Sequence, residues 1–349
     1  MVMGMSDEKN LGFFEKYLTV WIFLCIGIGI ALGKVFPQIA IQIDSMQVYS
    51  VSIPIAILLF FMIYPIMVQI DFKQVVKAGK TPKPVLVTLL VNWGIKPFTM
   101  LFFAWLFMDK VFAAYLTDAQ ASQYIAGMIL LGVAPCTAMV LVWGYLAKGN
   151  QGHTLVMVAI NSLVMLILYA PLAQFLLGIG DIIVPWETML LSVGLYVGVP
   201  LVAGYFSRNY LLKNKGADWF MTTFSPVMHN IAITALLITL ITLFSLQGHV
   251  MLDKPFVIAM IAVPLLIQVV FIFFLGYGIS KAIGLSYEDA APTALIGASN
   301  HFEVAIAVAA MLFGINSGAA LATVVGVLIE VPVMLGLVKI CLKTRNMFK

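Results

Sequence analysis

Apolar residues run through this chain in stretches long enough to cross a bilayer. A membrane-spanning helix needs about 20 mostly apolar residues. Ten stretches of about this length are present: 17–36, 48–70, 84–108, 122–147, 152–178, 187–207, 220–245, 255–280, 289–313 and 317–341. The polar segments between them are short, which leaves no room for a separate soluble domain. The pattern predicts an all-α membrane protein with ten transmembrane helices.

The composition excludes a soluble globular protein. Of the 349 residues, 62% are apolar and only 10% are charged, and the mean hydropathy is +1.07. Soluble domains are about half apolar and a quarter charged. The net charge of +4 comes from lysines in the loops and does not indicate a nucleic-acid partner. The three cysteines form no disulfide framework or zinc motif. No G-x-x-x-x-G-K-[ST] motif is present, so we expect no ATP hydrolysis and no cofactor.

Basic residues indicate the orientation of the chain in the membrane. Cytoplasmic loops carry an excess of Lys and Arg. With a cytoplasmic N-terminus, the inner segments hold fifteen basic residues and the outer segments hold three, while Lys96 lies within a span. We therefore expect an even number of helices in a plasma-membrane protein, with both termini in the cytoplasm.

Two of the apolar stretches are interrupted near their midpoints. Residues 132–137, Gly-Val-Ala-Pro-Cys-Thr, interrupt the fourth stretch, and residues 297–303, Gly-Ala-Ser-Asn-His-Phe-Glu, interrupt the ninth. Each interruption is in the fourth helix of a five-helix unit. A five-helix unit crosses the membrane an odd number of times, so its copy must be inverted. Paired broken helices in inverted repeats mark the binding site of many secondary transporters. We divide the chain into repeats 1–180 and 181–349.

Cys136 follows a residue that favours the start of a new helix. Pro135 cannot continue a helix but is common in its first turn. We therefore expect Cys136 in the first turn of a half-helix, where free N–H groups favour an anion. A thiol in that place can act as a nucleophile or as a soft-metal ligand. It can equally be a structural cysteine beside a proline kink.

Glu303 has a similar setting in the other broken helix. Gly297, Ser299 and Asn300 are poor helix formers. We expect the helix to restart with Asn300 as N-cap and Glu303 at the third helical position. That spacing suits a capping box with a purely stabilising role. However, a charge in the bilayer costs roughly 2.5–3.5 kcal/mol and is rarely present there without a function.

Three further ionisable residues lie within the apolar stretches. Glu330 precedes Pro332 in the tenth stretch and can be functional or can pair with a neighbouring helix. Lys96 can form such a pair, which would offset the cost of burial, or can extend toward an interface. His301 can carry protons or can simply fill space with a hydrogen-bonding side chain.

Four motifs resemble those of the ten-helix arsenite efflux permeases. They are Ala134-Pro-Cys-Thr-Ala-Met-Val-Leu-Val-Trp143, the segment from Gly297 to Val308, the segment from Gly314 to Pro332, and Asn92-Trp-Gly-Ile-Lys-Pro-Phe98. Together they span most of the chain. This family belongs to a superfamily with the bile-acid symporters and riboflavin-type carriers, and differs from the larger twelve-helix arsenite pumps.

The resemblance implies a fold of two bundles. Helices 1, 2, 6 and 7 would form a panel, and helices 3–5 and 8–10 would form a core in which broken helices 4 and 9 cross. It also implies that Cys136 and Glu303 match a cysteine and a glutamate that the family requires, and that Glu330 matches a second acid. His301 departs from the pattern, since the family more often has an aromatic residue there.

The function implied is efflux of trivalent arsenic, and of antimonite as a further candidate, in exchange for protons. A soft thiolate suits a thiophilic metalloid. We assign Cys136, as the arsenic ligand, with Glu303 and Asn300 to substrate binding, and Glu303 and Glu330 to proton coupling. The supporting residues are Lys96, Pro135, Thr137, Ser299 and His301. The expected partners are therefore arsenite or antimonite, protons and the lipid bilayer, and we expect a transporter rather than an enzyme.

Three alternatives remain open. A sodium-coupled organic anion symporter could use the same fold, with Glu303 and unwound carbonyls binding Na⁺. A passive metalloid channel would be indifferent to a protonophore. An intramembrane cysteine hydrolase would use Cys136, His301 and Glu303, but residues two apart on a helix, such as His301 and Glu303, point to different faces.

Overall fold

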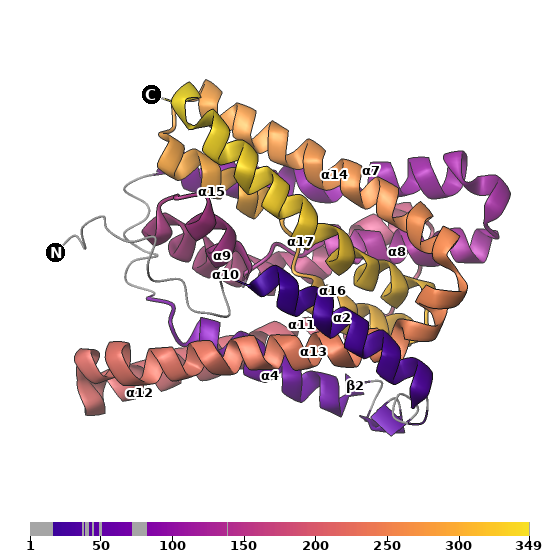
Figure 1. The fold of residues 1–349 in the computed structure, drawn as a ribbon, viewed down its shortest axis with the longest axis horizontal. Coiled ribbons are helices and arrows are strands. Elements are labelled where there is room, and N and C mark those ends of the chain that lie inside the picture. Colours follow the sequence, from indigo (N-terminus) through magenta and orange to yellow (C-terminus); the bar gives the residue numbers. More distant parts are fainter. Residues whose placement is uncertain are drawn as a thin grey trace.

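The computed structural model shows a bundle of long helices (Figure 1). It describes residues 17–348 except 37, 39–41, 44, 49–50, 72–81 and 138. Six of the fifteen basic residues used for orientation lie outside the described residues: Lys9, Lys16, Lys73, Lys77, Lys80 and Lys349. Among these described residues, five helical stretches are long and apolar enough to cross a membrane by length and composition. The expectation of an all-α membrane protein is confirmed, apart from one short hairpin.

The helices of the first half follow the apolar stretches closely. In chain order, the elements are α2 (Leu18–Val35), β1 (Gln47–Val48), β2 (Val51–Ser52), α4 (Ile53–Met67), α6 (Pro82–Leu89), η2 (Leu90–Ile95), α7 (Lys96–Trp105), η3 (Leu106–Val111), η4 (Ala113–Tyr115), α8 (Asp118–Val133), α9 (Met139–Leu146) and α10 (Gln151–Ile179). The second apolar stretch, expected to be helical from residue 48, instead starts with strands β1 and β2, which pair antiparallel.

The helices of the second half extend past their expected ends in two places. The elements are α11 (Trp186–Val193), η5 (Gly194–Gly198), α12 (Val199–Trp219), η6 (Phe220–Phe224), α13 (Ser225–Asp253), α14 (Pro255–Ala282), α15 (Tyr287–Ala298), α16 (Phe302–Phe313), α17 (Gly318–Thr344) and η7 (Arg345–Met347). The chain departs from helical geometry at Gly216, whose φ of +83° is accessible mainly to glycine. There the chain turns from α12 toward α13 (Figure 1).

The described helices pack in two groups. Helix α13 packs against α2 and α4, and α12 packs against α4. In the second group, α8 packs against α7 and α17, and α14 packs against α15 and α17. Figure 1 shows α4, α12 and α13 along one edge of the molecule, with α7 and α14 along the opposite edge and α17 running diagonally toward the middle. Helix α11 contacts α10 and α16, which pack against α8 of the second group. It continues through η5 into α12 of the first group, so it joins the two groups.

Glycine allows the closest helix contacts in the second group. A Cβ on Gly127 of α8 would lie 2.2 Å from the carbonyl oxygen of Ala319 and 2.8 Å from the Cβ of Ala322, both on α17. Small residues at an interface let backbones approach, which is how helices associate in lipid. Residue 127 must therefore be glycine for α8 and α17 to keep their spacing.

We predict that Gly127→Ala destabilises the protein, because the methyl group must displace a backbone carbonyl. Overpacking of this kind costs about 1–3 kcal/mol. Gly336→Ala on α17 is the matched control, since a Cβ there meets no atom within 4 Å. Thermal unfolding of the detergent-solubilised protein would measure both. Equal melting temperatures for Gly127→Ala and the unmodified protein would contradict the prediction.

Candidate functional site

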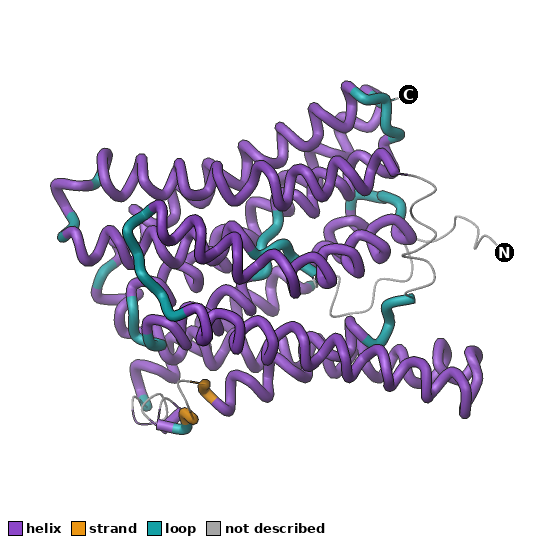
Figure 2. Tube along the Cα trace, turned by 180° about the vertical axis from the view of Figure 1, so that it is seen from behind, coloured by secondary structure: helices purple, strands orange, loops and turns teal. Residues whose placement is uncertain are grey.

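The two interrupted helices meet at their breaks. Pro135, between α8 and α9, pairs with Asn300, between α15 and α16, as an isolated antiparallel β-bridge. The N–H of His301 donates to the carbonyl of Ala134 at 2.8 Å, and the N–H of Cys136 donates to the carbonyl of Ser299 at 3.4 Å. Helix α8 packs against α16, and α9 packs against α15. Figure 2 shows the loop segments at these breaks enclosed by helices.

Each half-helix restarts slightly later than the sequence predicts. Helix α9 begins at Met139, so Cys136 lies in the break and not in the first helical turn. The Met139 N–H is nevertheless a hydrogen-bond partner of the Cys136 sulfur, so the thiol does lie at a helix N-terminus. The N-cap of α16 is His301, not Asn300, and Glu303 is the second helical residue. No side chain caps α16, so the alternative in which Glu303 only completes a capping box is wrong.

Ser299 connects two of the buried charges. Its carbonyl accepts a hydrogen bond from the ammonium of Lys96 at 2.9 Å. Its hydroxyl donates to the Oε1 of Glu330, which also accepts from the N–H of Asn300 at 3.2 Å. Among the described residues, Lys96 and Glu330 form no direct ion pair within 4.0 Å, although they interact electrostatically. The expected Lys96–carboxylate pair is therefore indirect and runs through Ser299.

His301 and Glu303 lie side by side. The Nε2 of His301 is 3.6 Å from the Oε2 of Glu303. The expectation that they point to different faces is wrong, because His301 is an N-cap residue with φ −89° and ψ 73° and lies outside the helix. The geometric argument against a Cys–His–Glu constellation therefore does not hold. The choice between hydrolysis and transport must come from other observations.

All nine site residues named from the sequence are buried. Seven of them lie at or next to the breaks: Pro135, Cys136, Thr137, Ser299, Asn300, His301 and Glu303. The other two, Lys96 in α7 and Glu330 in α17, bond to Ser299. The thiol of Cys136 interacts with Ser299, Glu303 and Glu330. The structure thus brings one sulfur, two carboxylates and one ammonium together in the interior.

Several oxygens at this place have no hydrogen bond to another described residue. They are the Oγ1 of Thr137, the Oδ1 of Asn300, both carboxylate oxygens of Glu303 and the Oε2 of Glu330. Buried polar atoms normally have partners, so unpaired ones call for an explanation. Together with the thiol, they form a set of acceptors that a small hydroxylated substrate or a proton can satisfy. In the described part of the chain, no three His, Cys, Asp or Glu residues are grouped as a metal site.

A widened helical turn positions Lys96. The turn η2 is a π-helix in which the Lys96 N–H bonds to the carbonyl of Val91, five residues earlier. The next residue, Pro97, has no N–H to offer the helix, and π-turns are frequent at functional sites. The indole N–H of Trp93 donates to the side chain of Asn161 on α10 at 3.3 Å, which fixes this turn against its neighbour.

Two buried amide side chains, one in η2 and one in α14, were not among the residues predicted for the site. Asn92 in η2 and Gln268 in α14 are fully buried, and neither side chain has a hydrogen-bond partner among the described residues. Gln268 is the single polar residue in the run Pro264-Leu-Leu-Ile-Gln-Val-Val270. That interruption is the signal that could have identified it.

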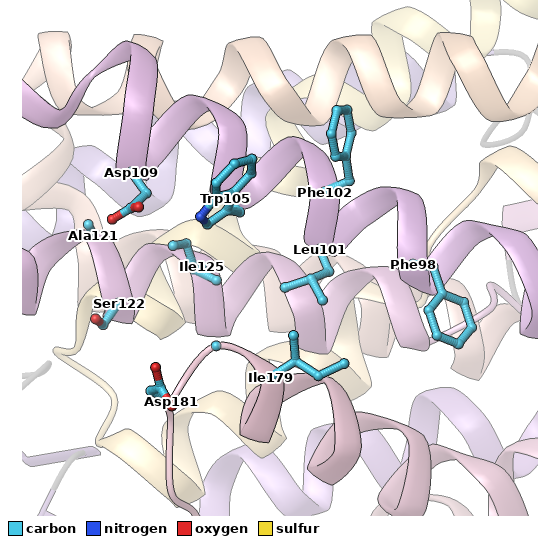
Figure 3. Close-up of a pocket in the computed structure, with 11 residues that line it drawn as sticks. Phe98, Leu101, Phe102, Trp105, Asp109, Ala121, Ser122, Ile125, Ile179 and Asp181 are labelled. Atoms are coloured by element: carbon cyan, nitrogen blue, oxygen red, sulfur yellow. The ribbon is translucent and has the colours of Figure 1, made fainter.

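A large cavity lies elsewhere in the molecule. Its volume is about 570 Å³, and α7, η3, α8 and the end of α10 line it. Figure 3 shows Asp109, Ser122 and Asp181 toward one side of it and Phe98, Leu101 and Ile179 toward the other. None of the nine predicted site residues lines it. Its aromatic side chains Phe98, Phe102 and Trp105 are exposed at the protein surface, so we do not place the chemistry there.

We predict that Ser299→Ala lowers the melting temperature, because it leaves the buried Glu330 carboxylate without its hydroxyl donor. Removing one partner of a buried hydrogen bond costs about 1–3 kcal/mol. Ser280→Ala is the control: Ser280 is equally buried, but its hydroxyl bonds only to the carbonyl of Gly276 in its own helix. Thermal unfolding that fails to distinguish the two variants would show that Ser299 does not hold Glu330.

Known proteins resemble this chain over nearly its whole length. Residues 56–254 match the sodium bile acid symporter family. An uncharacterized transporter of Synechocystis is 61% identical, covering 97% of this chain and 91% of the relative. The arsenical-resistance protein Acr3 of Alkaliphilus metalliredigens is 51% identical, covering 99% and 96%, and that of Corynebacterium glutamicum is 34% identical, covering 95% and 90%. With the apolar helices, these relatives identify a multi-pass membrane protein. The chain belongs to the sodium bile acid symporter family and, within it, to the Acr3 arsenical-resistance proteins.

Proposed function

We propose that this protein exports arsenite from the cytoplasm in exchange for protons and so confers arsenic resistance. The observation that carries the proposal is the buried group at the crossing of two broken helices: the thiol of Cys136 with the carboxylates of Glu303 and Glu330. The Acr3 relatives, named for arsenical resistance, support arsenic as the substrate. Antimonite, which shares its thiophilic chemistry, is a second candidate substrate.

In this proposal the chain crosses the membrane ten times, in two inverted repeats, 1–180 and 181–349. The panel comprises α2, α4, α11–α12 and α13, and the remaining helices form the core. Both termini are cytoplasmic in this proposal, which the excess of basic residues in the inner segments supports. In this arrangement, the crossing of α8–α9 with α15–α16 lies near the middle of the membrane, where transporters with broken helices bind substrate.

The binding step is an exchange of ligands on arsenic. Arsenite enters as the neutral trihydroxide, and the Cys136 thiol replaces one hydroxyl, which leaves as water with the thiol proton. A single sulfur bond keeps binding weak enough for release. The two remaining arsenic hydroxyls donate to the unpaired oxygens at the break, among them Asn300 Oδ1 and Glu303. Three thiolates would bind arsenic too tightly for turnover, and Cys136 is the only cysteine at the crossing among the described residues.

The coupling step follows from charge balance. Glu303 and Glu330 carry two negative charges when ionised, and Lys96 carries one positive charge, so one proton neutralises the empty site. Loading from the cytoplasm releases that proton inward. Outside, a proton returns to Glu303 or Glu330, water cleaves the S–As bond, and the trihydroxide leaves. Each cycle moves one metalloid outward and one proton inward.

Sodium-coupled uptake of organic anions is the alternative, because the family model bears the name of sodium symporters. Such carriers bind Na⁺ through carbonyls of unwound helices. In this chain, the Ser299 carbonyl is bonded to Lys96 and Cys136, and the Ala134 carbonyl is bonded to His301. Donors of the protein itself therefore occupy both carbonyls, which favours proton coupling. Hydrolysis is less well supported, since the relatives are named as transporters or for arsenical resistance.

We predict that everted membrane vesicles containing this protein accumulate arsenite, and that a protonophore abolishes the accumulation. Proton exchange requires a gradient, whereas a channel does not. Passive flux that is unaffected by the protonophore would indicate a channel. Vesicles that take up an organic anion only with sodium, and no arsenite, would support the alternative.

We also predict that Cys136→Ser and Glu303→Gln each reduce arsenite accumulation at least about tenfold, the effect of losing about 1.4 kcal/mol of substrate interaction. Cys341→Ser and Glu187→Gln are the matched controls: Cys341 is equally buried but lies in α17, and Glu187 is exposed in α11. Full arsenite transport by Cys136→Ser would overturn its role as the arsenic ligand.

A further inference from the structure

Lys96 is a positive charge fixed in the interior of the protein. Its side chain is fully buried, and its ammonium donates to the Ser299 carbonyl at the break before α16. It also interacts electrostatically with Glu330, Cys136 and His301. A buried ammonium carries a large desolvation cost unless hydrogen bonds and opposite charges compensate it. Here the Ser299 carbonyl and the Glu330 carboxylate provide that compensation.

The bonded carbonyl belongs to the class of groups that bind sodium in coupled transporters. Unwound carbonyls at broken helices coordinate Na⁺ in such proteins, and Na⁺ is a hard cation that prefers oxygen ligands. Ser299 is the last residue before the break, and its carbonyl points to an ammonium instead of a free ion. Next to it lies the Oε1 of Glu330, bonded to the Ser299 hydroxyl.

The Lys96 ammonium cannot exchange with solvent ions, because it belongs to a side chain whose backbone is held in place. The π-turn before Pro97 and the Trp93–Asn161 hydrogen bond fix the segment from which Lys96 extends. An ammonium held in this way bonds to the Ser299 carbonyl and offsets the Glu330 charge without having to enter or leave the site. A free cation would have to enter and leave with each cycle.

We propose that Lys96 is a built-in cation that takes the place of a coupling sodium ion at the helix crossing, so that transport by this protein does not depend on sodium. The inference rests on the proposed arsenite transport and goes beyond it by naming the residue that determines the coupling ion. Removing the ammonium takes a donor from the Ser299 carbonyl and a counter-charge from the Glu330 carboxylate, and Na⁺ or a small alkylammonium ion can take its place.

The test compares sodium chloride with choline chloride at equal ionic strength. Everted vesicles would contain the unmodified protein, Lys96→Ala, Lys96→Arg or the control Lys281→Ala, which removes an exposed lysine from the end of α14. We expect the unmodified protein and Lys281→Ala to accumulate arsenite equally in both salts. We expect Lys96→Ala to lose at least about tenfold in choline, because a buried carboxylate is left uncompensated, and to regain transport with sodium or methylammonium.

A second measurement is independent of arsenite. The melting temperature of purified Lys96→Ala should rise with sodium concentration, because an ion that binds only the folded state stabilises it, while that of the unmodified protein should not. If the unmodified protein transports no arsenite, the proposed function fails, and the melting temperatures still decide the role of Lys96.

Three results would overturn the inference. The first is sodium-dependent transport by the unmodified protein. The second is a folded Lys96→Ala variant whose transport and melting temperature are the same in sodium, methylammonium and choline. The third applies if Lys96→Ala does not fold in any of these salts: a folded Lys96→Gln variant that transports arsenite normally in choline would then show that the positive charge is not needed.

Discussion

The structure depends on the need to compensate charges that are buried in the interior of a membrane protein. Lys96, Glu303 and Glu330 are all buried, and their net charge is balanced only in part by one another. Main-chain groups supply much of the remainder, and they can do so only where a helix is interrupted. Ser299 and Asn300 illustrate this, since the Ser299 carbonyl accepts from Lys96 and the Asn300 N–H donates to Glu330. The two broken helices are therefore the condition for placing these charges in a membrane.

The same interruptions join the two halves of the chain. An uninterrupted pair of helices has no free backbone groups at its crossing, whereas the breaks here exchange hydrogen bonds between Ala134 and His301 and between Cys136 and Ser299. Any movement of α8 and α9 relative to α15 and α16 would break these bonds together with the Lys96 and Glu330 contacts. The crossing is therefore held together as one unit, and in the proposed transport cycle a change of access would occur around it, between the two groups of helices.

Hydropathy, Pro135 and the polar residues at 297–303 were sufficient to predict most of the helices and both breaks, whereas the meeting of the breaks was implied only by the resemblance to the arsenite permeases. Side-chain chemistry at a break was harder to predict, because one residue of register decides it. The sequence suggested Asn300 as the N-cap, but His301 takes that position, and its non-helical backbone brings it to 3.6 Å from Glu303. Periodicity describes residues inside a helix and cannot place one just outside it. Gln268 was missed for another reason, since a lone amide in an apolar run has no motif around it.

The unpaired acceptors explain how the proposed site could select its substrate without a complete set of metal ligands. In the proposed function, Cys136 contributes the one bond that requires a thiophilic element, and the oxygens of Thr137, Asn300, Glu303 and Glu330 that have no partner among the described residues accept hydrogen bonds. Leaving these oxygens unsatisfied destabilises the empty protein, since each buried acceptor without a partner carries a desolvation cost. Substrate or protons relieve that cost, so the site is more stable when occupied by either one. In the proposed function, each of the two relieves this cost in place of the other, so their binding would be mutually exclusive, which is the physical requirement for exchange.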